Sequence, residues 1–399
     1  MTLEQYRLLH HWTAHISPLL CITPVNQTNP FQMYLTPMSL CDSSSPVRYA
    51  VLSIAASHLA VSESNPDSSP LAIAAQNYRI NAIASLRETL AQDLTIAARS
   101  DATLASILLL EMSKQFDSSG DSDVNHLIGA KEVIVARGGP QSMTTPCARF
   151  LLNQILYHDM LSTVSRGTEP LICHCWPSKE GDTCTSPRSL DLESSRGYHP
   201  AILQALARVS ELKARKEATA LSYDGNDDDD ENNRKATLAD LMFVGQQVEN
   251  ELTSMNFAAS PSDHQRHTTE AHRSAALIYL YRVIYDIGAP HELTLSQVRR
   301  CIGSMASVPI SSPLISAHVW PLFTAGCEAT EPEDREFVKQ RLMNMYRLRR
   351  IQSLQKVCEL MEQVWLSKDY KHSMEGAEEM SRVGCIEVVK GLGEMLHLV

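Results

Sequence analysis

The sequence of 399 residues lacks an apolar run as long as a membrane-spanning helix, which needs about 20 residues. Its densest apolar run, Leu104 to Met112, is interrupted by Ser106 and Glu111. The N-terminal residues MTLEQYRLLHHW do not contain the basic segment followed by an apolar one that marks a secretory signal. Neither a membrane anchor nor a secretory signal is therefore expected.

Basic residues are also scarce. The sequence has 35 Lys and Arg against 46 Asp and Glu, which gives a formal net charge of -11. Affinity for nucleic acid comes largely from Lys and Arg on the phosphates. We therefore expect that this chain alone does not bind DNA directly.

Paired cysteines are absent as well. Ten cysteines are spread from Cys21 to Cys385, and none of them forms a Cys-x-x-Cys pair. Because no secretory signal accompanies them, reduced and buried thiols are favoured over a disulfide framework.

Strand patterns are scarce and no repeat of fixed period occurs, whereas helical periodicity runs through most of the chain. The pattern predicts an all-α fold without a sheet: one large irregular helical domain over residues 1–399, in which helix pairs pack around one extended core. Helices are expected at about 3–16, 46–61, 71–90, 101–114, 124–137, 148–165, 200–216, 238–255, 268–287, 331–349, 350–365 and 375–397. The acidic segment YDGNDDDDENN at 223–233 is expected to be a disordered or surface loop, because it offers no apolar side chain to bury.

The most informative stretch is LISAHVWPLFTAGCEATEPEDREFV at 314–338. The apolar block Val319 to Phe323 is followed by small residues, which allow close approach of neighbouring helices. Thr330 as a cap, Pro332 in the first turn and Glu333 in a capping box predict the start of a new helix. The stretch therefore predicts a buried helix, a sharp stop and a second helix, with Trp320 in the core.

This stretch resembles the hallmark segment of the fungal-specific transcription factor regulatory domain. That helical region is usually found downstream of a fungal binuclear zinc cluster. The family's Trp-Pro-Leu-Phe block, Gly-Cys-Glu-Ala step and Asp-Arg pair stand here, in order, at Trp320 to Phe323, Gly326 to Ala329 and Asp334-Arg335.

Further motifs of the family occur in the same order over roughly residues 1–369. They are His126-Leu127, Gly129-Ala130, Arg137-Gly138-Gly139, Tyr157-His158-Asp159 and the segment Ala276 to Val283. The family's Trp before the His-Leu pair is missing, and Val124 is the nearby apolar residue. The zinc cluster needs six cysteines in tight pairs, so no DNA-binding domain is expected in this chain.

Several residue groups imitate metal sites. Cys173-His174-Cys175 with Cys184 does not match the common structural zinc spacings, and His11 with His15 lacks an evident third ligand. Asp227, Asp228 and Glu231 resemble the magnesium motif of all-α terpene synthases, but they stand in the acidic segment without the second metal motif. No metal site or cofactor is therefore predicted.

Catalytic motifs are missing too: the sequence has no Gly-x-Ser-x-Gly elbow, no Walker loop and no His-Glu-x-x-His helix. Cys327 is interpreted as a buried small residue, and the basic group Arg347, Arg349 and Arg350 as a solvated helix face. No catalytic residue is predicted, and the chain is not expected to be an enzyme.

The resemblance implies a transcription regulator of the fungal zinc-cluster type, present in the nucleus, with the cytoplasm left open as a second location. It implies a regulatory domain that acts through proteins of the transcription machinery, a small-molecule inducer or a homodimer. Two alternatives remain open at this point: a metal-dependent enzyme similar to terpene synthases, and a helical scaffold protein.

Overall fold

The computed structural model describes residues 1–22, 28–41, 45–63, 68–117, 124–172, 199–221, 228–392 and 398. Within these ranges the secondary structure is helical, with no strand. The all-α prediction is confirmed. No helix of the described residues is long and apolar enough to cross a membrane.

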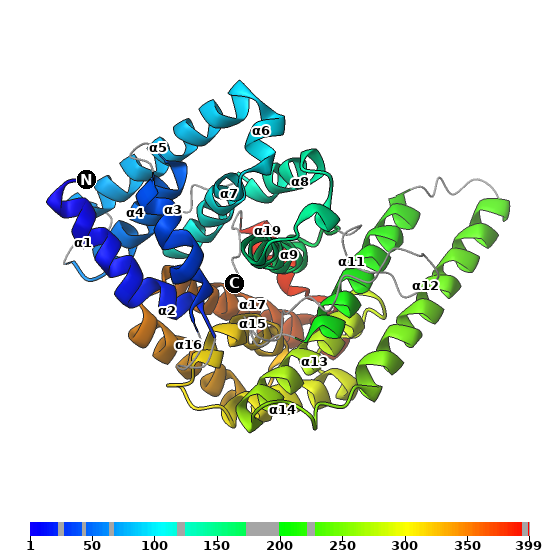
Figure 1. The fold of residues 1–399 in the computed structure, drawn as a ribbon. Coiled ribbons are helices and arrows are strands. Elements are labelled where there is room, and N and C mark those ends of the chain that lie inside the picture. The colour runs from blue at the N-terminus through cyan, green and yellow to red at the C-terminus, as the bar shows by residue number, and fades with distance from the viewer. Residues whose placement is uncertain are drawn as a thin grey trace.

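The N-terminal helices lie on one side of the molecule (Figure 1). The longest two of this group, α4 and α5, pack against each other, and α4 also packs on α7. Their elements are α1 (Leu3–His11), the π-helical turn η1 (Trp12–Ile16), α2 (Ser17–Leu20), the π-helical turn η2 (Phe31–Leu35), α3 (Thr36–Cys41), α4 (Pro46–Ala60), α5 (Pro70–Gln92) and α6 (Leu94–Arg99).

The middle of the chain supplies the centre of the fold and a long hairpin. Helix α9 lies centrally, while α11 and α12 extend away from the rest side by side (Figure 1). The elements are α7 (Asp101–Ser113), the 3-10 turn η4 (Lys114–Phe116), α8 (His126–Ala136), the 3-10 turn η5 (Pro140–Ser142), α9 (Pro146–Arg166), α11 (Pro200–Leu221) and α12 (Asp228–Ser254).

In the view of Figure 1, the helices from α13 to α17 lie below α9, and α19 lies beside α9. Helix α15 is surrounded by α13, α14, α16 and α17. The elements are α13 (Asp263–Val283), α14 (Glu292–Ala306), the 3-10 helix η7 (Pro313–His318), α15 (Val319–Glu328), α16 (Pro332–Arg349), α17 (Gln352–Glu375), α18 (Ala377–Arg382) and α19 (Cys385–Gly391).

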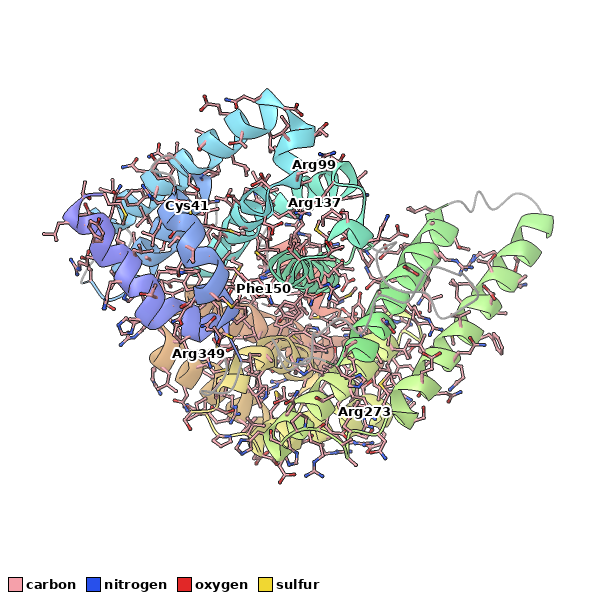
Figure 2. All side chains as sticks on the ribbon, in the orientation of Figure 1. Cys41, Arg99, Arg137, Phe150, Arg273 and Arg349 are labelled. Carbon is pink, nitrogen blue, oxygen red and sulfur yellow. The ribbon has the colours of Figure 1, made fainter. Side chains whose placement is uncertain are left out.

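The buried apolar side chains form one contiguous cluster that includes residues from Leu8 to Leu398. Side chains fill the spaces between the helices, and Phe150 of α9 lies near the centre (Figure 2). Its ring meets the Phe31 ring edge-on at 5.0 Å between centroids. One continuous core supports the prediction of a single domain, which stays a prediction.

The stretch 314–338 adopts the predicted order of buried helix, stop and new helix. Trp320 is fully buried in α15. A Cβ atom at Gly326 would lie 2.4 Å from Met361 Sδ and 2.9 Å from Val338 Cγ1. The small residue therefore allows α16 and α17 to approach α15 closely, as the sequence pattern indicated.

Three boundary predictions were wrong. Glu331, not Thr330, is the N-cap of α16, and it makes no capping hydrogen bond with its side chain. The acidic residues 228–233 begin helix α12, whereas 222–227 lie outside the described residues. In the described part of the expected helix over 375–397, α17 ends at Glu375 and is followed by α18 and α19, with a break at Gly376, which has φ +94°; residues 393–397 lie outside the described residues.

Candidate functional site

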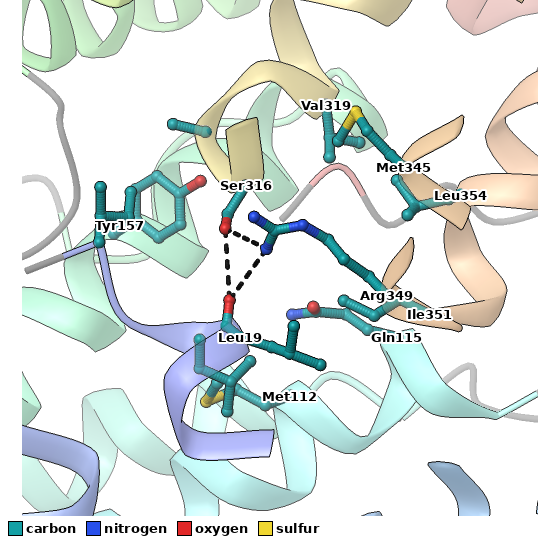
Figure 3. A pocket seen from close by; sticks show the side chains of 13 residues that line it. Leu19, Met112, Gln115, Tyr157, Ser316, Val319, Met345, Arg349, Ile351 and Leu354 are labelled. Atoms are coloured by element: carbon teal, nitrogen blue, oxygen red, sulfur yellow. Dashed lines mark hydrogen bonds between the residues drawn. The ribbon is translucent and has the colours of Figure 1, made fainter. Parts of the chain in front are cut away.

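A small pocket lies where three parts of the chain meet, at residues 19–22, 112–157 and 316–354 (Figure 3). Its volume is about 40 Å³, which is room for a few waters, since one water needs about 10–15 Å³. Its walls come from α2 and the chain after it, α7, η4, α9, η7, α15, α16 and α17 with the residue before it. The lining residues are Leu19, Leu20, Ile22, Met112, Gln115, Tyr157, Ser316, Ala317, Val319, Met345, Arg349, Ile351 and Leu354.

Arg349, the last residue of α16, joins three segments at this pocket. Its Nη1 donates to the Leu19 carbonyl at 3.2 Å and to Ser316 Oγ at 2.5 Å. Its Nη2 donates to the Pro313 carbonyl at 3.4 Å. The guanidinium therefore connects α2, η7 and the end of α16, and Figure 3 shows it pointing toward Leu19 and Ser316.

Among the described residues, the hydrogen-bond partners of the Arg349 guanidinium are neutral oxygens. Within the part of the chain that the structure describes, no carboxylate forms an ion pair with it, and burial lowers the pKa of Arg349 to about 10. A half-buried cation without a carboxylate is electrostatically costly. The pocket therefore favours an anionic group over a cationic one.

Two hydrogen-bonded histidines connect the C-terminal end of α16 to the N-terminal helices α1 and α4. His58 Nε2 lies 2.8 Å from the Arg349 carbonyl, and His11 Nε2 lies 2.9 Å from His58 Nδ1. Because a carbonyl oxygen only accepts, His58 donates from Nε2 and receives from His11 at Nδ1. Burial, followed by the neighbouring charge of His58, lowers the pKa of His11 to about 4, and burial lowers the pKa of His58 as well. Both rings are thus neutral near pH 7.

Acid should destabilise this fold between about pH 6.5 and pH 4. Burial lowers the pKa of His11, His126 and His272 to about 4 each, so the unfolded chain takes up protons first as the pH falls. The stabilising contribution of these neutral histidines is fully present above pH 6.5 and is lost as the pH falls to about 4. Fully buried His272 alone contributes up to about 3 kcal/mol to the free energy of unfolding. Asp159 acts in the opposite sense, because burial raises the pKa of its carboxyl to about 6; it offsets part of the loss. Urea unfolding followed by circular dichroism from pH 7.5 to pH 4.5 measures the slope.

The variant His272→Asn is the control for this expectation. It removes one titrating ring while its amide can still donate to the Thr268 carbonyl, which His272 Nδ1 approaches at 2.7 Å. We expect lower stability at pH 7.5 but a shallower decline with acid. A stability that does not change between pH 7.5 and pH 4.5 in the original chain would contradict the assignment.

A second polar cluster is buried at the end of α15. Glu328 Oε2 lies 2.7 Å from Lys368 Nζ, and its Oε1 lies 3.1 Å from Arg282 Nη2. The Ala289 amide also donates to Glu328 Oε2 at 2.8 Å. Burial alone would raise the pKa of Glu328, but Lys368 and Arg282 lower it overall, so the carboxylate is charged. The ion pairs of this cluster therefore connect α13, α15 and α17.

The candidate residues singled out from the sequence differ in their burial. Cys327 is buried, as predicted. Arg347 and Arg350 are exposed, but Arg349 lines the pocket, so the prediction of a solvated face is wrong for that residue. A stripe of polar residues on a helix surface does not reveal that Arg349, unlike Arg347 and Arg350, turns toward the pocket.

The rings of His11 and His15 are neighbours, with 4.9 Å between their centroids. His58 of α4 is hydrogen-bonded to His11. Even so, the described residues contain no group of three His, Cys, Asp or Glu side chains that could hold a metal ion. Cys173, His174, Cys175, Cys184 and Asp227 lie outside the described residues.

Asp228 begins α12, and Glu231, whose side chain is 46% exposed, pairs with Lys235 at 2.7 Å. Lys235 lies one turn further along the same helix. This pairing is typical of a solvated helix start.

Sequence reasoning missed Lys368 and His58. Lys368 had a detectable signal, because it follows Met361, Val364 and Trp365 on the apolar face of α17. His58 had none, since its partners His11 and Arg349 are distant in the sequence.

A model of the fungal-specific transcription factor domain matches residues 7–393. The chain belongs to this family. No curated protein and no solved structure gives a significant match to the chain. Membership in a family of transcription factors supports a role in transcription regulation, and it confirms the resemblance of the stretch 314–338.

Proposed function

We propose that this chain is the regulatory domain of a transcription regulator of the fungal zinc-cluster type, acting in the nucleus through contacts with other proteins. The observation that carries the proposal is the family match, which extends over residues 7–393. The acidic balance, with a net charge of -11, supports a domain that leaves DNA contact to another module. Self-association into a homodimer belongs to the same proposal.

The junction around Arg349 is the part of the domain best placed to respond to a signal. Its guanidinium contacts Leu19 and Ser316, and its carbonyl accepts from His58. A change at Arg349 therefore alters contacts of α2, α4, η7 and α16 at the same time. Such a junction suits a regulatory domain, because a local event there shifts helices that carry distant surfaces.

A small-molecule inducer would have to open this junction. Pockets for drug-sized ligands measure about 300–1,000 Å³, whereas this one measures about 40 Å³. The hydrogen-bond partners of the Arg349 guanidinium in the described part of the chain are neutral oxygens, so the guanidinium favours a ligand with a carboxylate or another anionic group. Binding would then couple charge pairing at Arg349 to separation of α2 from η7.

The experiment joins residues 1–399 to a heterologous DNA-binding domain and measures a reporter gene in fungal cells. We expect reporter output to differ from that of the DNA-binding domain alone. The variant Arg349→Met should change this output at an equal protein level, and Arg347→Met is the matched control, since Arg347 is exposed on the same helix. A fusion that behaves as the DNA-binding domain alone would refute the proposal. Magnesium-dependent turnover of a prenyl diphosphate by the purified chain would favour the enzyme alternative instead.

A further inference from the structure

Two cysteines from separate helices lie in contact beside the Glu328 cluster. Cys327 belongs to the last turn of α15, and Cys385 is the first residue of α19. Their thiols are hydrogen-bonded to one another, and both are free. The sulfur atoms of two free thiols are thus neighbours in the folded protein.

Arg282 holds these two segments together independently of the sulfurs. Its guanidinium pairs with Glu328, the neighbour of Cys327, at 3.1 Å. The same group donates to the Ser381 and Val383 carbonyls, just before Cys385. The approach of Cys385 to Cys327 is therefore fixed by a charged anchor.

The two thiols have unequal acidity. The hydrogen bond from Cys327 is the largest influence that lowers the pKa of Cys385; burial opposes it, and the positive charges of Arg282 and Lys368 add to it. Burial raises the pKa of Cys327 far above its usual range. Of the two thiols, Cys385 therefore loses its proton more readily than Cys327.

Access to solvent is unequal in the same sense. Cys327 is fully buried, whereas Cys385 is partly exposed. A partly exposed cysteine whose thiol is the more acidic of two neighbouring thiols is the arrangement in which a first oxidation is followed by disulfide formation.

We propose that Cys385 and Cys327 are a peroxide-reactive pair that closes into a disulfide joining α19 to α15. The Cys385 thiolate attacks one oxygen of hydrogen peroxide, the O–O bond breaks, and hydroxide leaves to take up the proton that Cys385 released. The Cys327 sulfur then attacks the Cys385 sulfur, the S–O bond breaks, and the hydroxyl leaves as water with the Cys327 proton. Peroxide is reduced to two waters and the two thiols are oxidised to one disulfide.

The purified full-length chain is treated with hydrogen peroxide, alkylated, digested without reduction and mapped by mass spectrometry. We expect a linked peptide pair that contains Cys327 and Cys385, about 2 Da lighter than the sum of the two thiol peptides and separated by dithiothreitol. Exposed Cys41 is the internal control and should be modified only at higher peroxide doses. Absence of the linked pair at a dose that oxidises Cys41 overturns the proposal.

Two variants test the order of the steps. In Cys327→Ser, a sulfenic acid should accumulate at Cys385 and be trapped by dimedone. In Cys385→Ser, dimedone should not label Cys327, and peroxide should leave the melting temperature unchanged, whereas in the original chain the disulfide should raise it. Labelling of Cys327 before Cys385 would also overturn the assignment. If either variant fails to fold, the mapping of the original chain decides. The outcome is independent of the proposed role in transcription, because every readout uses the purified protein.

Discussion

Replacing Trp320 with Ala is expected to lower the free energy of unfolding by about 3–5 kcal/mol, as for other buried aromatic residues. The Trp320 side chain is fully buried, and its ring lies 5.8 Å from the His272 ring, centroid to centroid. It belongs to α15, which packs against α13, α14, α16 and α17, so a cavity at this position would affect all five helices. Urea unfolding followed by circular dichroism measures the loss.

Phe243→Ala is the matched control, because Phe243 is also a large aromatic residue on a helix but 64% of its surface is exposed. Its loss should change the unfolding free energy by less than about 1 kcal/mol. Trp320→Phe, which keeps most of the ring volume, should lie between the two. Equal effects of Trp320→Ala and Phe243→Ala would show that α15 does not carry the core.

Features that depend on neighbouring residues were predictable from the sequence. Thr2 and Gln5 stand at the spacing of a capping box, and that capping box is present at the start of α1. Gly138 and Gly139 directly follow the end of α8, and both have positive φ, which is typical of a helix C-terminus. The buried helix around Trp320 needed only a dense apolar block.

Predicted element boundaries were wrong where side-chain charge or backbone conformation overrides the apolar sequence pattern. Acidic residues after position 227 were expected to form a loop because nothing there can be buried. Negative side chains at a helix N-terminus are stabilised by the helix dipole, however, and Glu231 gains Lys235 one turn away. The segment therefore begins α12 without contributing an apolar side chain.

The candidate site could not be predicted from the sequence, for a different reason. His11, His58 and Arg349 come from three helices that are distant in the sequence, and Cys327 and Cys385 come from two others. Such pairs depend on tertiary packing, which no local period encodes. Only the family resemblance, carried by stretches such as 314–338, connected the sequence to function.

The second large effect is expected at the buried carboxylate of Glu328. In Glu328→Gln, the negative charge disappears while Lys368, with 1% of its side chain exposed, and Arg282 remain beside it. Removal of one partner from a buried ion pair costs about 3–5 kcal/mol, because the other charge is left uncompensated. We expect a loss of that size in urea unfolding at pH 7.

An exposed ion pair supplies the control. Lys339 Nζ and Glu362 Oε1 lie 2.6 Å apart with 44% and 37% of their side chains exposed, so Glu362→Gln should cost at most about 1 kcal/mol. The double variant Glu328→Met with Lys368→Met removes both buried charges and refills their volume with apolar side chains. It should be more stable than Glu328→Gln, since Arg282 still donates to the Ser381 and Val383 carbonyls. A double variant less stable than Glu328→Gln would mean that the charged cluster itself, and not the uncompensated lysine, determines the loss.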